Sequence, residues 1–448
     1  MTGDLDIEPT LAQRLRDYGE ALDGIESPVV IPTRERHRQR KPAWRVAAAA
    51  AAVIGISTGA ALLLNERRVD VATRPAMTWS SLASSPLGAR RSSASLWTGT
   101  EWIVWGGLSD LSDDAIGLRD GAAYEPQSDT WRSIPDAPFA GWDPVAARWI
   151  GDEAVFVVNW LLGDTAGYRT VAFAPSSDTW SVLPPSSEYM FGAALTDDSV
   201  FWLRLDADKG VLIEQELRTG NERRRQLPRG PAWDIQQGFR GLATRDGVVF
   251  VGRTTATCCS PGPAAMALIV RDDSLVLVLV PDEIRDLERF GIYGDAVATA
   301  TSVLFVGEVN EDGMLRRVAY SLDPATATWS PVVAPSQGLF SEHHTSGSST
   351  LLAAAGEHAV VLGGLDLGDG SIGGLDDYVA ASVADRDLTE WFDLPVAPIN
   401  LDRVAFISAW TGNELLIWGG ETSDTGPNNV TDRILTDGAR LRINSPQS

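Results

Sequence analysis

The chain has few of the side chains on which enzyme chemistry usually depends. Its 448 residues include only 2 Cys, 4 His and 7 Tyr. The two cysteines, Cys258 and Cys259, adjoin each other, so alone they supply too few ligands for a zinc site. No Ser-His-Asp set, phosphate-binding loop or GxGxxG helix start can be recognised. These scarcities favour a binding protein over an enzyme.

The cysteine pair lies in the Gly- and Pro-containing stretch TATCCSPGP. An even number of cysteines in an exported protein favours a disulfide. A bond between Cys258 and Cys259 would close a small strained ring and stiffen this stretch. Free thiols and intermolecular bridges are the alternatives.

Positive charge is also scarce in most of the chain. Residues 1–76 hold 11 of the 37 Lys and Arg and 10 of the 60 Asp and Glu, which leaves 26 against 50 in the remainder. A body with a net charge of −24 repels phosphate backbones, so we expect no nucleic-acid partner. Only 2 of the basic residues are Lys, a bias typical of GC-rich bacterial genomes.

One long uncharged run stands near the N-terminus. Residues 46–64 (VAAAAAAVIGISTGAALLL) would span about 28 Å as a helix, enough for a bilayer core. Six basic residues crowd its N-terminal side and three follow it, which favours an N-terminus inside and a C-terminus outside. We expect a single-pass anchor in the cytoplasmic membrane; a cleaved signal peptide or a buried soluble helix are the alternatives. The predicted parts are a cytosolic tail (1–45), the span (46–64), a linker (65–76) and an exported domain (77–448).

The tail contains a short amphipathic pattern. Five apolar residues recur at 4-3-4-3 spacing, namely Leu11, Leu15, Tyr18, Leu22 and Ile25. Such a helix cannot bury its apolar stripe alone, so it would dock on a cytosolic partner. A helix lying on the membrane, or no stable helix, is the alternative.

The exported part is repetitive. Seven short apolar strands recur every 45 to 57 residues, the length of a four-stranded propeller blade. We expect them to be the inner strands of the blades; they are residues 101–107, 153–159, 198–204, 247–253, 301–307, 358–364 and 414–420.

Most repeats have a second marker, a turn followed by a Trp that opens an outer strand. Examples are YEPQSDTW at 124–131 and FAPSSDTW at 173–180. The seventh repeat lacks this strand, whereas residues 77–86 (MTWSSLASSP) carry one at the other end of the domain. The N-terminal strand is therefore predicted to complete the seventh blade and close the ring, which removes two open sheet edges.

The double glycine at 106–107, followed by Tyr124 and Trp131, resembles a kelch repeat of the kelch and galactose-oxidase-like propellers. Double glycines recur at 363–364 and 419–420, and repeats three and four lack both markers. The resemblance covers residues 77–443 and implies an all-β, seven-bladed kelch-like propeller. Propellers of this family mostly bind partners and only sometimes catalyse.

The resemblance also implies a binding face, because the loops after the second strand of each blade gather on one side of the ring. Four of these loops are long, namely 108–121, 254–265, 365–377 and 421–436. Two are acidic, with candidate site residues Asp110, Asp113 and Asp114 in one and Asp366, Asp369, Asp376 and Asp377 in the other. Calcium is a candidate cofactor for such loops, although their spacing is not that of an EF-hand, and solvated loop charge is the favoured interpretation.

These features favour a membrane-anchored, extracytoplasmic module that binds a protein or a glycan. A first alternative is a transmembrane regulator resembling an anti-sigma factor, with an exported sensor and a tail that holds a cytosolic partner. A second alternative is an exported carbohydrate-active or oxidising enzyme.

Overall fold

The computed structural model describes residues 76–444, apart from 113–116, 163–164, 185–191, 207–208, 228–238, 246, 253–264, 272, 280, 282–291, 300–301, 312–313, 336–350, 356–357, 363–380, 386–387, 402, 404 and 427–428. In this part of the chain, no helix is long and apolar enough to cross a membrane. The predicted tail and membrane segment lie outside the described residues, as does all but the last residue of the predicted linker.

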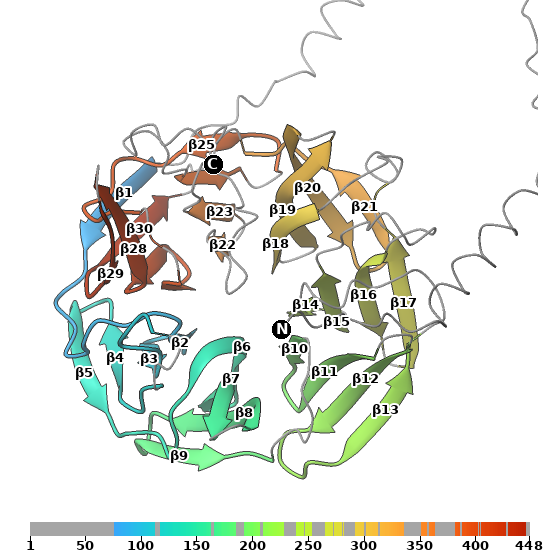
Figure 1. The fold of residues 1–448 in the computed structure, drawn as a ribbon, viewed down its shortest axis with the longest axis horizontal. Helices are drawn as coiled ribbons and strands as arrows, with labels where there is room; N and C mark the ends of the chain where they lie inside the picture. Colours follow the sequence, from blue (N-terminus) through green and yellow to red (C-terminus); the bar gives the residue numbers. More distant parts are fainter. Residues whose placement is uncertain are drawn as a thin grey trace, which may run out of the picture. The chain divides into compact units, whose positions relative to one another are not determined.

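Seven four-stranded antiparallel sheets follow one another along the chain as the blades of a propeller (Figure 1). Blade one is β2 (Ala94–Trp97), β3 (Trp102–Trp105), β4 (Gly121–Glu125) and β5 (Thr130–Ile134); blade two is β6 (Trp142–Ile150), β7 (Glu153–Leu162), β8 (Thr165–Ala174) and β9 (Thr179–Val182). Blade three is β10 (Gly192–Leu195), β11 (Ser199–Asp206), β12 (Lys209–Glu216) and β13 (Glu222–Gln226); blade four is β14 (Phe239–Thr244), β15 (Gly247–Gly252), β16 (Ala265–Arg271) and β17 (Ser274–Leu279). Blade five is β18 (Ile292–Ala298), β19 (Val303–Glu311), β20 (Met314–Asp323) and β21 (Thr328–Pro331); blade six is β22 (Leu351–Ala355), β23 (His358–Leu362), β24 (Ala381–Ala384) and β25 (Trp391–Asp393). Blade seven is β26 (Ile407–Trp410), β27 (Glu414–Trp418), β30 (Gly438–Asn444) and β1 (Ala76–Ser81), with a hairpin of β28 (Glu421–Gly426) and β29 (Asn429–Ile434) between β27 and β30.

The ring is closed, as the sequence predicts. The first strands of successive blades contact one another, and β26 of blade seven contacts β2 of blade one. Strand β1 pairs antiparallel with β30 from Ala76 opposite Asn444 to Ser81 opposite Ala439. The N-terminal strand therefore completes the blade whose other strands come from the C-terminus, and no blade is left with three strands.

The repeated apolar runs form the second strand of each blade rather than the innermost one. Their side chains are covered by the neighbouring blades on both faces, so β3 and β27 are buried along their whole length. This agrees with the prediction that the long loops follow second strands. The first strands, which the sequence does not reveal, carry small residues that give a weak apolar signal. Crowding demands such residues: a Cβ on Gly241 of β14 would lie 2.1 Å from the Ala193 carbonyl oxygen of β10.

Tryptophans of the outer strands join blades one, two, six and seven to the blade that precedes each of them. The Trp131 indole N–H donates to the Ala83 carbonyl at 3.0 Å, and that of Trp180 donates to the Pro135 carbonyl at 2.8 Å. Trp391 makes the equivalent bond from blade six to blade five. Each indole buries an apolar ring and satisfies its single donor with a carbonyl beyond the neighbouring outer strand, so it fixes the blade spacing.

The double glycines serve the same purpose on the inner side of the blade. Gly106 and Gly107 have φ angles of +69° and +95°. The N–H of Gly107 donates to the Gly141 carbonyl at 2.8 Å, at the entrance to blade two. A Cβ on Gly106 would lie 2.1 Å from that same carbonyl oxygen, so no larger residue fits without moving the backbone.

Replacing Gly106 by Ala should therefore destabilise the propeller by about 2–4 kcal/mol, because it combines a strained φ with a backbone clash between two blades. The matched control is Gly88→Ala, since nothing lies within 4 Å of a Cβ at Gly88. That variant should unfold within about 0.5 kcal/mol of the parent protein. Urea unfolding followed by tryptophan fluorescence measures both; equal midpoints for the two variants would contradict the role of the double glycine.

Candidate functional site

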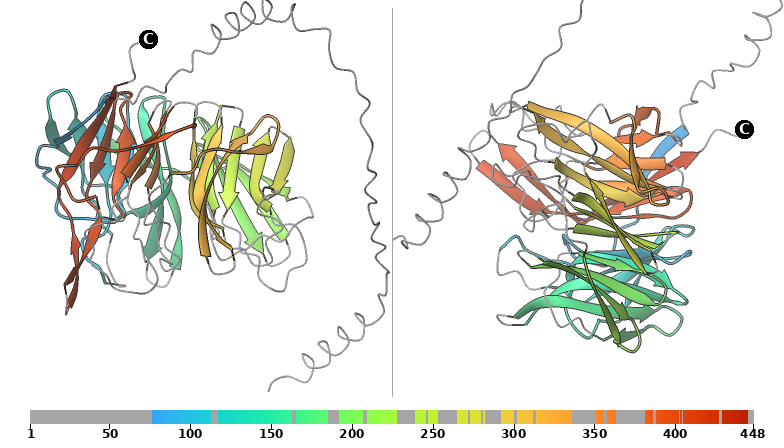
Figure 2. Two further views of the ribbon diagram at one scale, coloured as in Figure 1. Left: turned by 90° about the horizontal axis from the view of Figure 1, so that it is seen from above. Right: turned by 90° about the vertical axis from the view of Figure 1, so that its right-hand side faces the viewer.

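The connections between second and third strands lie beside the segments that enter the blades. Arg91 and Leu108 form an isolated backbone bridge, and Leu108 forms another with Gly117. In blade seven, the predicted long loop is instead the ordered β28–β29 hairpin (red), which extends beyond the other strands in the left view of Figure 2. We call the side of the ring that carries these connections the loop face.

A buried arginine fixes the base of the loop face in blade one. Arg90 is 2% exposed, and its guanidinium donates to the two Asp120 carboxylate oxygens at 3.0 and 2.9 Å. A further bond goes to the Gly106 carbonyl at 3.1 Å. Asp120, which lies at the end of the acidic 108–121 loop, therefore neutralises a buried cation at the base of the loop face.

Blade seven repeats this arrangement. Arg403 is also 2% exposed, and it donates to both Asp437 carboxylate oxygens at 3.2 Å and to the Gly419 carbonyl at 3.1 Å. In both blades the Arg precedes its glycine by 16 residues. The bases of the two connections are thus built alike, although one holds a loop and the other a hairpin.

The segments that enter the first strands are linked around the axis of the ring. Ser92, Asp143 and Ala405 have left-handed φ angles of 53°, 48° and 53°. The Asp143 N–H donates to the Ser92 carbonyl and the Ser92 N–H to the Ala405 carbonyl, each at 2.8 Å. The shared conformation therefore belongs to the inter-blade linkage, and it also fixes the backbone from which the Asp143 side chain extends.

Polar side chains from blades one, two and seven meet at this position. The Asn159 Nδ2 group donates to the Asp143 carboxylate at 2.8 Å. Arg91 Nε lies 3.2 Å from the Glu421 carboxylate and donates to the Asp110 backbone carbonyl at 3.3 Å. We call these five residues the loop-face cluster; Arg91, which also acts electrostatically on Asp143, is its central cation.

The pKa values of the two aspartates in the cluster are shifted in opposite directions. Desolvation raises the pKa of the Asp143 carboxyl, against the opposing effects of the Asn159 hydrogen bond and the Arg91 charge. Hydrogen bonds from the side chain and backbone of Ser112 lower the pKa of the exposed Asp110 carboxyl. Of the two aspartates, Asp143 is therefore the one whose charge is less well compensated by its surroundings.

Asp110 is the only sequence-predicted site residue that the described part of the chain contains, and it belongs to the loop-face cluster. The other acidic candidates lie outside the described residues, as do the cysteine pair and the tail helix; they are Asp113, Asp114, Asp366, Asp369, Asp376, Asp377, Cys258, Cys259, Leu11, Leu15, Tyr18, Leu22 and Ile25. These assignments stay predictions.

Sequence reasoning missed Arg91, Asp143, Asn159 and Glu421. Asp143 and Pro144 open the first strand of blade two, which has no strong apolar pattern to reveal it. Asn159 ends a recognised apolar run, and its position beside Asp143 follows only from the pairing of Trp142 with Asn159. Residues of different blades meet here because of ring closure, which leaves no local signal in the sequence.

The cluster offers one guanidinium, three carboxylates and one amide, which suit hydrogen bonding to a polar ligand. Within the described residues, no group of three His, Cys, Asp or Glu side chains could hold a metal ion. No family model and no curated protein matches the chain. The fold is a seven-bladed β-propeller, an architecture typical of binding and interaction modules.

The opposite pKa shifts give an experimental signature. For Asp143 the folded pKa is raised above the ordinary value of 3.8, so the native state holds its proton more tightly than the unfolded state. Its contribution to stability therefore falls as pH rises through 3.8 and above. Asp143→Asn should gain stability relative to the parent protein as the pH is raised from about 3.5 to 6.

Asp110→Asn is the control with the opposite sign, because the lowered pKa of Asp110 adds stability above 3.8 that is lost at lower pH. Thermal unfolding of both variants from about pH 2.5 to 6, a range that includes the pH values below 3.8 at which Asp110 is protonated, measures the two slopes. Parallel slopes would contradict the environment assigned to Asp143.

Proposed function

We propose that this protein is a membrane-anchored, extracytoplasmic binding module that holds a protein or glycan ligand on the loop face of a kelch-like propeller. The loop-face cluster is the observation that carries the proposal. It gathers polar groups from three blades, and hydrogen bonds between the blades hold the backbone that carries them. Such a platform recognises a ligand without having to order its own backbone first.

The likeness of blades one and seven supports the kelch-like assignment. Gly419 and Gly420 have φ angles of +70° and +92°, close to those of the pair in blade one. The N–H of Gly420 donates to the Arg90 carbonyl at 3.0 Å, the same kind of contact with the next blade that Gly107 makes. The double glycine thus forms the same inter-blade joint in blades one and seven, which supports the kelch-like assignment.

The proposed location outside the membrane rests on the sequence that precedes the propeller. An uncharged run of nineteen residues with more basic residues on its N-terminal side favours an anchor whose C-terminal side is exported. The acidic body suits an exposed, soluble domain held away from anionic lipid.

Asn159→Ala tests the binding face with little effect on folding, since Asn159 is a partly exposed residue that bonds Asp143. The loss of one hydrogen-bonding group should weaken ligand capture about tenfold. The matched control is Asn221→Ala in blade three, where the amide bonds the exposed carboxylate of Glu216 in the hairpin that joins the third and fourth strands.

The measurement is quantitative mass spectrometry of proteins and glycans that co-purify with the full-length chain from detergent-solubilised membranes. Partners that decrease with Asn159→Ala and persist with Asn221→Ala would be ligands of the loop face. Partners that respond equally to both variants, or to neither, would overturn the loop face as the binding site.

A transmembrane regulator is the second candidate, because the tail carries the apolar stripe described above. A chain without residues 1–33 should lose a cytosolic partner in the same purification and keep its envelope partners. An unchanged set of partners would remove the tail from the function and leave an anchored binding module.

A further inference from the structure

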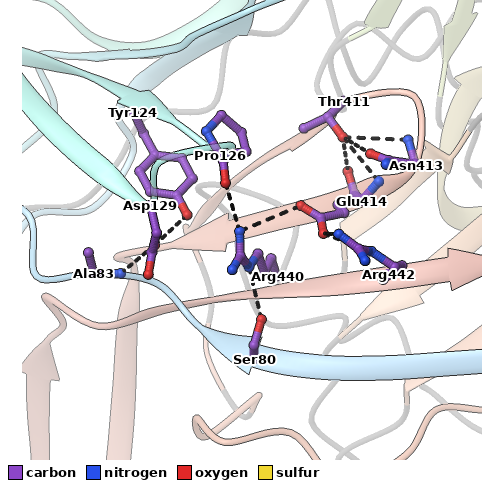
Figure 3. A network of polar contacts seen from close by, with 10 residues as sticks. All are labelled: Ser80, Ala83, Tyr124, Pro126, Asp129, Thr411, Asn413, Glu414, Arg440 and Arg442. Carbon is purple, nitrogen blue, oxygen red and sulfur yellow. Dashed lines mark hydrogen bonds and ion pairs between the residues drawn. The ribbon is translucent and has the colours of Figure 1, made fainter.

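The first strand and the two residues after it contact three consecutive blades. β1 pairs with β30 in blade seven, and the Trp79 indole N–H donates to the Pro395 carbonyl of blade six at 2.9 Å. In blade one, Trp131 donates to the Ala83 carbonyl, and the Ala83 N–H donates to the Asp129 carboxylate at 3.0 Å. Figure 3 shows Ser80 and Ala83 of this segment beside the polar network that they border. We call residues 76–83 the strap.

The strap buries little of its own surface. No side chain of β1 is fully buried; Met77 and Trp79 pack against the core of blade seven, and Leu82, just after β1, packs against the core between blades one and seven. Its partner β30 is mostly buried, with Leu441 at 0% and Ile443 at 6% exposure. Local stability increases with buried apolar area, so we expect the strap to need less free energy to open than β30.

The charges around the strap remain paired without it. Arg440 donates to Ser80 Oγ at 2.9 Å, but it also donates to the Pro126 carbonyl at 2.9 Å and lies 3.9 Å from Glu414. Glu414, which is 5% exposed, keeps Arg442 at 2.6 Å. All these partners except Ser80 lie outside the strap, in blades one and seven, as Figure 3 shows.

Asp129 is the other carboxylate that the strap touches. It accepts a hydrogen bond from the Tyr124 hydroxyl at 2.6 Å, so it keeps a strong donor when the Ala83 N–H leaves. Opening of the strap therefore strands no buried charge, the outcome that usually makes local opening costly.

We propose that the strap is a releasable closure: it opens and recloses while the remaining strands of all seven blades stay folded, and it couples the chain before residue 76 to the closure of the ring. The chain preceding the domain enters the ring through β1, so a pull or a partner acting there reaches this strand first. Release uncovers one edge of β30 and removes the outer contacts between blades six, seven and one.

Hydrogen exchange of the full-length chain tests this directly. Amides of the strap, and those of β30 that face it, should exchange at least about tenfold faster than amides of β27. Trp79→Ala should speed exchange of the strap further and leave β27 unchanged. Equal exchange of β1 and β27 would overturn the proposal, because the strap would then open only when blade seven unfolds.

A reversible lock provides the matched control. Ala76 and Asn444 are opposite each other at one end of the ladder and both are exposed. Cross-strand Cα spacings of about 4.5–5.5 Å fall within the range of disulfides, so Ala76→Cys with Asn444→Cys, in a Cys258→Ser and Cys259→Ser background, can be oxidised. Oxidation should slow strap exchange to the rate of β27 and reduction should restore it; a lock that changes nothing would equally overturn the proposal.

Discussion

The pairing of β1 with β30 is the contact that closes the ring. It joins residues from the two ends of the domain, and among the described strands it is the only pairing within a blade that local chain connectivity does not favour. Without it, blade seven would end in an open edge, and the indole of Trp131 and the carboxylate of Asp129 would each lose a partner in the closing segment. Closure thus converts seven similar sheets into one body.

Two further sets of hydrogen bonds link neighbouring blades. On the outer side, an indole N–H reaches back to a carbonyl of the preceding blade, as Trp180 does to Pro135. On the inner side, a glycine N–H reaches forward, as Gly107 does to Gly141. Each is a bond of about 1 kcal/mol. Because they act at different radii, together they fix both the separation and the tilt of neighbouring blades. The same contacts support the loop face. Arg90 donates a hydrogen bond to the Gly106 carbonyl, so the base of the blade-one loop is held beside the double glycine that joins blades one and two.

The sequence predicts those parts of the fold that local physics determines. The second strands are continuous apolar runs because both faces are buried, and the tryptophan turns recur in the blades whose outer strand is anchored by an indole. Closure of the ring is predicted from the number of strands, because the outer strand missing from the seventh repeat appears before the first repeat. The first strands escaped notice, since the crowded axis selects for small residues such as those of β10, which carry little apolar signal. The loop-face cluster could not be predicted either: Arg91, Asp143 and Glu421 belong to three blades, and only the closed ring brings them together.

The same reasoning separates the acidic residues into two kinds. Asp120 and Asp437 each neutralise a buried arginine, so their negative charge stabilises the folded blades. Asp143 has an amide neighbour and a more distant cation, and desolvation leaves its charge incompletely compensated. Destabilised charge at a fixed position is what a polar ligand can relieve by supplying donors of its own. The excess of carboxylates in this domain therefore does not mark a site by itself; the proposed site differs from the other acidic positions because the ring holds Asp143 without fully neutralising its charge.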